Sequence, residues 1–253
     1  MSAAAETSPP EEIRSKLNHS ERDCDEHFIE FMPYYMDFVE EVGGASMVET
    51  FRQNRIGEIR MSPSAWHNMS REQRQHQLRW RRPFYALPTK LVQDRATPML
   101  PRLFYRRMDE LGVDFSVLYP TLGLDMLFIK NDEVRQAACR ALNKMNANVW
   151  AEFSGRMAPV AAILTTTPEE GVAELDYAIG ELGLKGIMIS DNVHRYIPQV
   201  EQEALEWARH EMWYDHMAMD SKFDYDPFWA KCVEHKVAPT SHSGHQVIGS
   251  MKS

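Results

Sequence analysis

The sequence contains few cysteines and no long apolar run. Its 253 residues include three cysteines, Cys24, Cys139 and Cys232, and no C-x-x-C pair occurs. An odd number of widely spaced cysteines argues against a disulfide framework, so we expect a reduced protein of the cytoplasm. No apolar stretch approaches the roughly 20 residues that a membrane-spanning helix needs, and the N-terminus lacks the apolar core of a secretory signal. We therefore expect a soluble protein with no membrane partner.

Clustered basic residues and a phosphate-binding loop are also missing. The formal net charge is −9, and the densest basic segment, RWRRPF at residues 79–84, is short. Binding to nucleic acid relies on clustered Lys and Arg that neutralise phosphates, so we expect no nucleic-acid partner. No glycine-rich loop follows a predicted strand, and no serine lies in a G-x-S-x-G motif. These absences argue against a nucleotide-binding fold and against hydrolysis by a serine nucleophile.

Hydrophobic residues make up 43% of the chain, which is enough for a sizeable core. We expect residues 1–21 to form a flexible leader. Residues 22–253 form one domain in this interpretation, with insertions over about 31–95 and 191–224; the first insertion is read as helical pieces joined by loops. The last insertion is polar and rich in His, Trp and Met.

Strand-like runs alternate with helical patterns through this domain. The strands are predicted at 22–29, 113–121, 157–167, 184–190 and 237–244, and the helices at 97–112, 131–155, 167–183 and 226–236. Repeated alternation is typical of parallel strands joined by crossover helices. The pattern indicates an α/β fold, either a TIM (β/α)₈-type barrel or an open doubly wound sheet.

Several residues mark where these helices begin and end. Thr167 and Glu170 have the spacing of a capping box, and Gly183 suits the end of the same helix. Asp226 is predicted to cap the helix 226–236, and Gly155 to end the helix 131–155. These positions predict the element boundaries.

The first strand carries an unusual polar pattern. Asp23, Asp25 and His27 lie at i, i+2 and i+4, so they point to one face of a strand. Carboxylates and an imidazole cannot lie in an apolar core without water, a cation or each other. Asp oxygen and His nitrogen suit Zn²⁺, Mn²⁺ or Fe²⁺. The alternative is an exposed edge strand with a solvated acidic face.

The last strand ends in a histidine. The run VAPTSHSG, 237–244, delivers His242 to the C-terminal end of a predicted parallel strand, where α/β folds place their active sites. His242 is therefore either a metal ligand or a hydrogen-bonded structural residue. His245, just past it, reads as a solvated loop residue.

Four further residues follow predicted strands and are candidates for substrate binding. Asp191, His194 and Arg195 come after the strand 184–190, and Arg195 could hold a substrate carboxylate by two hydrogen bonds. Tyr119 lies at the end of the strand 113–121 and could line a pocket. The alternatives are surface exposure for the first three residues and core packing for Tyr119.

In their order and spacing, these segments resemble the amidohydrolase-related family that contains aminocarboxymuconate-semialdehyde decarboxylase and the aromatic-acid decarboxylases. The resemblance runs from about residue 23 to residue 249. It rests on the opening D-x-D-x-H-x-x-E at 23–30, the segments 94–124, 181–189 and 220–239, and T-S-H-S-G at 240–244.

The resemblance implies a distorted (β/α)₈ barrel that holds one divalent metal, usually zinc. It implies that Asp25 and His27 on the first strand and His242 on the fifth are metal ligands. The family's catalytic histidine on strand six and aspartate on strand eight have no counterpart before residue 253, so no catalytic residue is assigned. We therefore expect only about the first five strands, in a C-terminally truncated barrel. Members of this family are often homodimers.

The resemblance also implies hydrolysis or non-oxidative decarboxylation of a small, aromatic or conjugated, carboxylated substrate. Three hypotheses follow. The first is a metal-dependent hydrolase or carboxy-lyase. The second is a truncated, catalytically inactive fragment of such an enzyme. The third is a binding module that uses the His- and Trp-rich insertion.

Overall fold

A five-stranded parallel sheet organises the computed structural model, which describes residues 9–53, 68–76, 89–121, 123–127, 129, 131–204, 212–217 and 220–242. The strand order is β1-β2-β3-β4-β7. The strands are β1 (Arg22–Phe28), β2 (Phe115–Pro120), β3 (Met157–Ala162), β4 (Gly186–Ile189) and β7 (Pro239–Ser241). All neighbours pair in parallel, which confirms the five predicted strands.

The order of the strands decides between the two predicted architectures. Each successive strand of the sheet is added on the same side of the previous one, with no reversal of the kind that defines a doubly wound sheet. The sheet also curls. In a flat sheet β1 and β7 would lie about 19 Å apart, because neighbouring strands are about 4.8 Å apart. The side chains of His27 and His242 nevertheless meet, with their Nε2 atoms 2.8 Å apart. The sheet is therefore half of a barrel.

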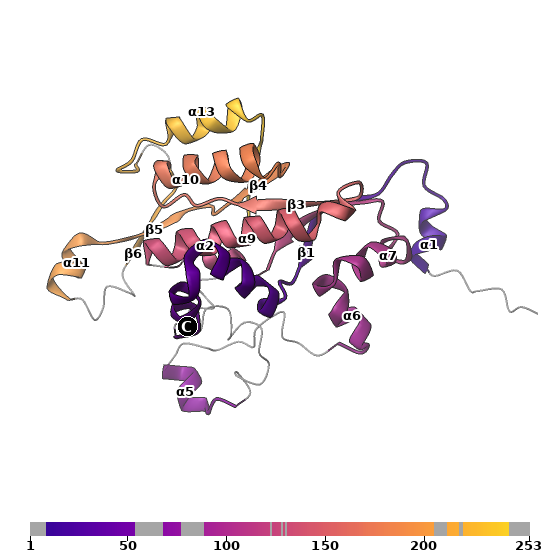
Figure 1. Ribbon diagram of the computed structural model, residues 1–253, viewed down its shortest axis with the longest axis horizontal. Helices are drawn as coiled ribbons and strands as arrows, with labels where there is room; N and C mark the ends of the chain where they lie inside the picture. Colours follow the sequence, from indigo (N-terminus) through magenta and orange to yellow (C-terminus); the bar gives the residue numbers. More distant parts are fainter. Residues whose placement is uncertain are drawn as a thin grey trace, which may run out of the picture.

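Helices between the strands supply most of the remaining core. They are α2 (Met32–Gln53), α6 (Val92–Ala96), α7 (Pro101–Leu111), α8 (Gly123–Met126), α9 (Asp132–Val149), α10 (Pro168–Leu175) and α13 (Asp226–Glu234), with 3₁₀ turns η2 (Thr97–Met99) and η3 (Ala151–Phe153) and a π-helix η4 (Asp176–Glu181). α9 packs against α2 and β3, and α10 packs against α13 (Figure 1). Leu142 and Leu118 belong to one buried cluster, and Leu175, Ile187 and Phe228 to a second.

The predicted cap of α10 is half correct. The side chain of Thr167 accepts a hydrogen bond from the backbone N–H of Glu170 at 3.3 Å, as a helix N-cap should. The carboxylate of Glu170 does not complete the capping box. It accepts instead from Arg135 Nη2 at 2.7 Å and from Gln136 Nε2 at 3.1 Å, both on α9. The buried guanidinium of Arg135 needs a carboxylate, and this tertiary contact replaces the local one.

Two other helix boundaries differ from the prediction. α13 begins at Asp226 itself, with Tyr225 as N-cap, and the backbone N–H of Asp226 donates to the Asp224 carboxylate at 2.9 Å. Asp226 is therefore the first helical residue and not the cap, and the side chain of Asp224, which precedes the cap, accepts from its backbone N–H. α9 ends at Val149, and the turn η3 follows before Gly155 is reached.

The predicted polar insertion at 191–224 contains an antiparallel hairpin that was not predicted. It is formed by β5 (Val193–Tyr196) and β6 (Met212–Asp215), with α11 (Pro198–Glu203) between them in the chain. Each strand has only four residues and carries charged side chains, so neither shows the alternation that predicts a strand. In the first insertion α2 is broken at Gly44, whose φ of 74° lies in the left-handed region.

Within the predicted leader, the short helix α1 (Pro9–Arg14) is described, and its Arg14 forms an ion pair with Asp114. The flexible leader over 1–21 stays a prediction. The other short helix of the first insertion is α5 (Arg71–His76). Among the described residues, every helix is too short or too polar to cross a lipid bilayer. RWRRPF and His245 lie outside the described residues.

Candidate metal centre

The parallel strands bring the predicted ligands to one edge of the sheet. Asp25 and His27 lie near the end of β1, and His242 directly follows β7, where its backbone N–H donates to the carbonyl of Ile189 at 3.1 Å. Because the carboxyl ends of parallel strands share one edge, curling of the sheet makes β1 and β7 converge there. His27 and His242 are 215 residues apart in the sequence, and the fold brings their side chains into contact.

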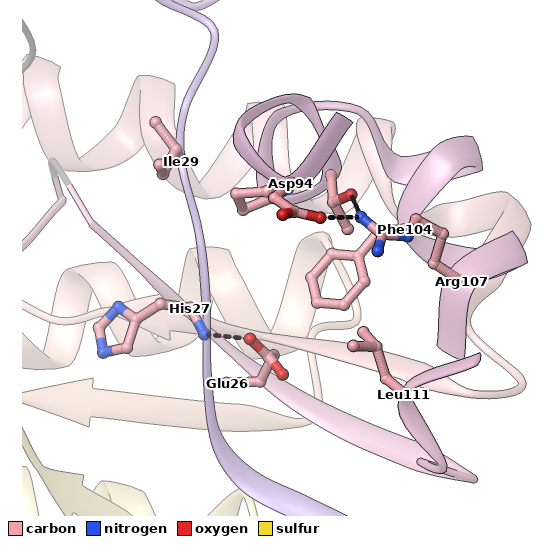
Figure 2. Close-up of a pocket in the computed structure, with 9 residues that line it drawn as sticks. Glu26, His27, Ile29, Asp94, Phe104, Arg107 and Leu111 are labelled. Atoms are coloured by element: carbon pink, nitrogen blue, oxygen red, sulfur yellow. Dashed lines mark hydrogen bonds and ion pairs between the residues drawn. The ribbon is translucent and has the colours of Figure 1, made fainter. Parts of the chain in front are cut away.

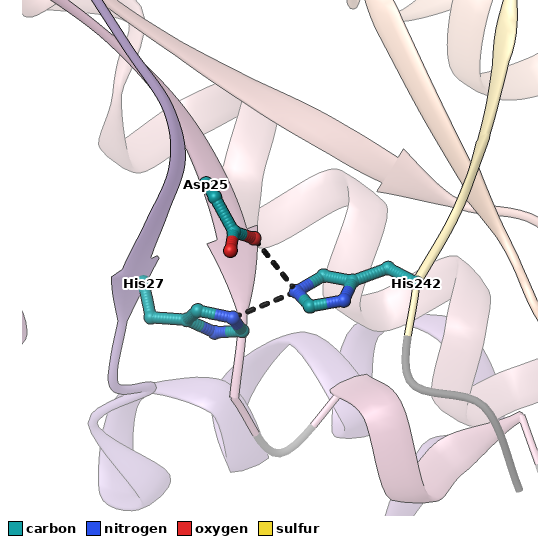
Figure 3. A group of neighbouring side chains, drawn as sticks. All are labelled: Asp25, His27 and His242. Carbon is teal, nitrogen blue, oxygen red and sulfur yellow. Dashed lines mark hydrogen bonds and ion pairs between the residues drawn. The ribbon is translucent and has the colours of Figure 1, made fainter.

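The three side chains meet at short distances. The Nε2 atoms of His27 and His242 are 2.8 Å apart, and His242 Nε2 lies 3.3 Å from Asp25 Oδ1 (Figure 3). One ligand atom from each residue can be chosen so that all three lie within 4.8 Å of one another. In the ranges that the structure describes, these residues form the group of histidine and acidic side chains close enough to share one ion.

Burial keeps the histidine on β1 neutral. Desolvation, followed by the neighbouring His242, lowers the pKa of His27 to about 4, against the opposing effects of Asp25 and Asp23. At neutral pH the ring of His27 is therefore uncharged, which is the form that binds metals. Asp25 is the open side of the group, since its side chain is 78% exposed, compared with 23% for His242.

The group fits a divalent cation. Two imidazole nitrogens and one carboxylate oxygen are a common donor set for Zn²⁺, Mn²⁺ and Fe²⁺. Ligand atoms of one ion lie roughly 3–4 Å apart when each metal bond is about 2.1 Å. The observed spacings are close to that range, so small side-chain movements would accommodate an ion.

Tyr119 lies beside this group. It ends β2 one strand away from His27, and its ring is nearly perpendicular to that of His242, with the centroids 4.6 Å apart. The centroid of His27 is 6.1 Å away. The Tyr119 side chain is buried, so it packs against the candidate ligands and limits the rotation of His242. Its role in substrate binding stays a prediction.

The other three predicted substrate-binding residues belong to the segment that leads into the hairpin. Arg195 donates to Asp215 at 2.9 Å, to the carbonyl of Thr166 at 2.8 Å and to the hydroxyl of Tyr225 at 3.0 Å. These contacts tie the hairpin to the end of β3, and Asp215 is fully buried. The ring of His194 contacts that of Tyr214, and Asp191 accepts from the side chain of Asn192. The structure does not bring these three into the metal-ligand group.

Glu30 is a site residue whose role the sequence pattern does not reveal. It is 1% exposed, and its carboxylate accepts from the backbone N–H groups of Gly123 at 2.9 Å and Thr121 at 3.2 Å. The hydroxyl of Thr121 donates to the carbonyl of Phe28 at 2.6 Å. Together these bonds fasten the end of β1 to the end of β2. A glutamate at i+3 after His27 is visible in the sequence, but its backbone partners are about 90 residues away.

The comparisons with known proteins agree with this architecture. The sequence model of the amidohydrolase family matches residues 93–251. One similar solved structure is a 5-carboxyvanillate decarboxylase from Novosphingobium aromaticivorans, with bound manganese and 3-methoxy-4-hydroxy-5-nitrobenzoic acid. Its sequence is 15% identical to this chain, and the TM-score is 0.52. The match covers 94% of this chain and 57% of that chain. A 2,6-dihydroxybenzoate decarboxylase from Rhizobium is 16% identical with a TM-score of 0.50, covering 88% of this chain and 50% of that one.

No curated protein sequence matches the chain significantly. The chain spans about half the length of the two solved structures. At these identities the likeness concerns the fold, and it confirms the barrel type that the strand order indicates.

Proposed function

Because the chain belongs to the amidohydrolase family, whose model matches more than half of its length, we propose that it forms the metal-binding part of an enzyme that hydrolyses or decarboxylates a small carboxylated substrate. The observation that carries this proposal is the convergence of Asp25, His27 and His242 at the carboxyl ends of β1 and β7. In barrels of this type, active sites lie at that edge.

Asp25, His27 and His242 would hold one divalent cation, with zinc or manganese as the ion. When bound, such a cation supplies Lewis acidity toward water and toward a carboxylate or carbonyl oxygen of the substrate. The neutral ring of His27 presents a lone pair without first losing a proton, because burial holds its pKa near about 4. The exposed carboxylate of Asp25 leaves the approach from solvent open.

Two other groups would orient this centre. The buried ring of Tyr119 packs edge-on against His242 and holds its plane. The bonds of Glu30 and Thr121 fix the spacing of the first two strand ends, on which His27 and Tyr119 lie. Both effects position the ligands before a substrate arrives, which lowers the cost of assembling the site.

Decarboxylation of an aromatic acid is the reaction to test first. The two solved structures reported above are named as decarboxylases of ring-hydroxylated benzoates, and one of them contains manganese. Hydrolysis remains the second reaction, since the same ligand set serves both. The substrate would be a small molecule that offers a carboxylate to the metal edge.

The test has two arms. Equilibrium dialysis of the chain, purified free of metal, should show about one Mn²⁺ or Zn²⁺ per wild-type chain and less than about a tenth of that for His242→Asn. His19→Asn is the matched control, because His19 is an exposed histidine outside the group. Release of CO₂ from hydroxybenzoates, measured with the metal-loaded chain, tests the reaction. Wild-type occupancy below about a tenth of an equivalent would contradict the proposal.

A further inference from the structure

A cavity lies on the other side of β1. Its volume is about 380 Å³, and it lies between β1 and the segment α6-η2-α7, open to solvent on one side (Figure 2). The lining residues are Glu26, His27, Ile29, Asp94, Thr97, Pro98, Phe104, Arg107 and Leu111. The volume is at the lower end of the range for small-molecule sites, about 300–1,000 Å³.

The two faces of β1 separate this cavity from the candidate metal centre. Residues Asp25 and His27 alternate with Glu26, so their side chains point to opposite faces of the strand. Figure 2 shows the carboxyl of Glu26 on the side of α7 and the ring of His27 on the opposite side of the strand. The cavity therefore lies behind the candidate metal centre, and His27, whose ring faces that centre, is also one of its lining residues.

The arginine in the cavity wall is already neutralised. Arg107 donates to Asp94 at 3.0 Å, to the hydroxyl of Thr97 at 2.7 Å and to Glu110 at 2.9 and 2.8 Å. Its side chain is only 12% exposed. With its charge offset by two carboxylates and four of its five N–H groups engaged, Arg107 is a wall of the cavity and not a receptor for an anion.

Glu26 is the acidic group of the cavity that lacks a cation. Its carboxylate accepts from the backbone N–H of His27 at 3.3 Å, and no lysine or arginine among the described residues forms an ion pair with it. A carboxyl that is desolvated beside other carboxylates gains from a positive partner.

The remaining walls are apolar. Pro98, Phe104 and Leu111 line the space beside Glu26, and Phe104 is buried. A ligand that fits must therefore combine one positive head group with an apolar body. An anionic ligand would meet the carboxyls of Glu26 and Asp94, while the charge of Arg107 is already offset by Asp94 and Glu110.

From this geometry we infer that the cavity binds a small primary amine, whose ammonium group pairs with Glu26 and whose aromatic or branched aliphatic body lies against Phe104, Pro98 and Leu111. The inference does not depend on the proposed enzyme function, because the cavity and the metal centre lie on opposite faces of β1. Amine binding adds a second ligand to the protein and places it directly behind two candidate metal ligands.

Calorimetric titration of the 253-residue chain with phenethylamine, phenethyl alcohol and phenylacetate tests the inference. We expect phenethylamine to bind about tenfold or more tightly than the alcohol, since a charge-assisted hydrogen bond is worth more than a neutral one. Phenylacetate should not bind. Glu26→Gln should remove the preference for the amine while leaving the alcohol within about twofold.

A second pair of variants tests the cavity without touching Glu26. Leu111→Trp should fill the space and weaken binding of amine and alcohol alike by about tenfold, since it occupies the apolar contact area. Leu100→Trp is its control, because Leu100 is an exposed leucine that does not line the cavity. The inference is overturned if wild-type chain binds the amine no better than the alcohol, or if Leu111→Trp leaves the amine affinity unchanged.

Discussion

The two faces of β1 carry titratable groups that are driven to neutrality by the same physical cause, with different consequences. On one face desolvation lowers the pKa of His27 to about 4, and on the other it raises the pKa of Glu26 to about 7. A neutral imidazole is ready to bind a metal ion. A partly buried carboxyl gains from a positive partner, which favours its ionised form. One strand of seven residues would therefore serve both proposed sites.

The largest expected effect is the difference in metal affinity between a substitution on one face of β1 and a substitution on the other. We expect His27→Ala to weaken Mn²⁺ or Zn²⁺ binding by about 100-fold or more, because it removes a direct ligand. Glu26→Gln should change the same affinity by less than about threefold, because only a screened charge is lost. Competition with a metal-binding dye measures both. Equal losses in the two variants would show that the faces are not independent.

A large loss of stability should follow removal of the carboxylate at the end of this strand. Glu30→Ala leaves two buried backbone N–H groups without their acceptor and should lower the free energy of unfolding by about 3 kcal/mol. Urea denaturation measures the change. Glu12→Ala, at an exposed helix position, should alter it by less than about 0.5 kcal/mol. A Glu30→Ala protein as stable as wild type would show that this bond pair does not hold the strand ends.

The two faces should also respond oppositely to pH in the metal-free chain. The raised pKa of Glu26 contributes stability that is present below about 4.5 and is lost as the pH rises through about 7. The lowered pKa of His27 contributes stability that is present above about 6.5 and is lost as the pH falls through about 4. In the wild type these two dependences oppose each other between about pH 4.5 and 6.5.

Substituting either residue should remove its own pH dependence of stability and leave that of the other residue. In the presence of a chelator, Glu26→Gln should become more stable relative to wild type as the pH rises through this window, by on the order of 2 kcal/mol, and His27→Gln should do the reverse. Denaturation curves at intervals of pH measure the difference. If the free energy of unfolding of both variants ran parallel to that of the wild type over this pH range, neither group would be desolvated as the structure places it.

The smallest effect concerns the ring beside His242. Tyr119→Leu should weaken metal binding by about threefold, because it removes the edge-on contact that holds the His242 ring. Tyr119→Phe keeps the contact and should match wild type. The dye competition assay resolves this difference, and a larger loss for Phe than for Leu would point to the hydroxyl group instead of the ring.

The sequence predicts much of the parallel sheet and the candidate ligands because both depend on local pattern. Alternation on β1 places Asp25 and His27 on one face, and the short apolar run before His242 identifies a strand end. The same alternation places Glu26 on the opposite face, but the cavity there depends on how α7 packs, which no local pattern contains. The hairpin is missed because its charged strands are stabilised by the buried pair of Arg195 and Asp215, 20 residues apart.

Capping shows the same limit at smaller scale. Thr167 caps α10 as its sequence position indicates, while the carboxylate of Glu170 turns to Arg135 on another helix. Local hydrogen bonds compete with tertiary ones, and a buried guanidinium makes the tertiary bond stronger. The sequence therefore predicts where elements begin better than it predicts which long side chains reach across them.

X-ray absorption at the zinc edge, on the chain loaded with one equivalent of Zn²⁺, tests the central claim most directly. If Asp25, His27 and His242 hold the ion, the spectrum contains the multiple scattering of two imidazole rings with zinc–ligand distances of about 2.0–2.2 Å, and His242→Asn removes one ring. A spectrum without imidazole scattering, or one that His242→Asn leaves unchanged, would contradict the assignment of this centre.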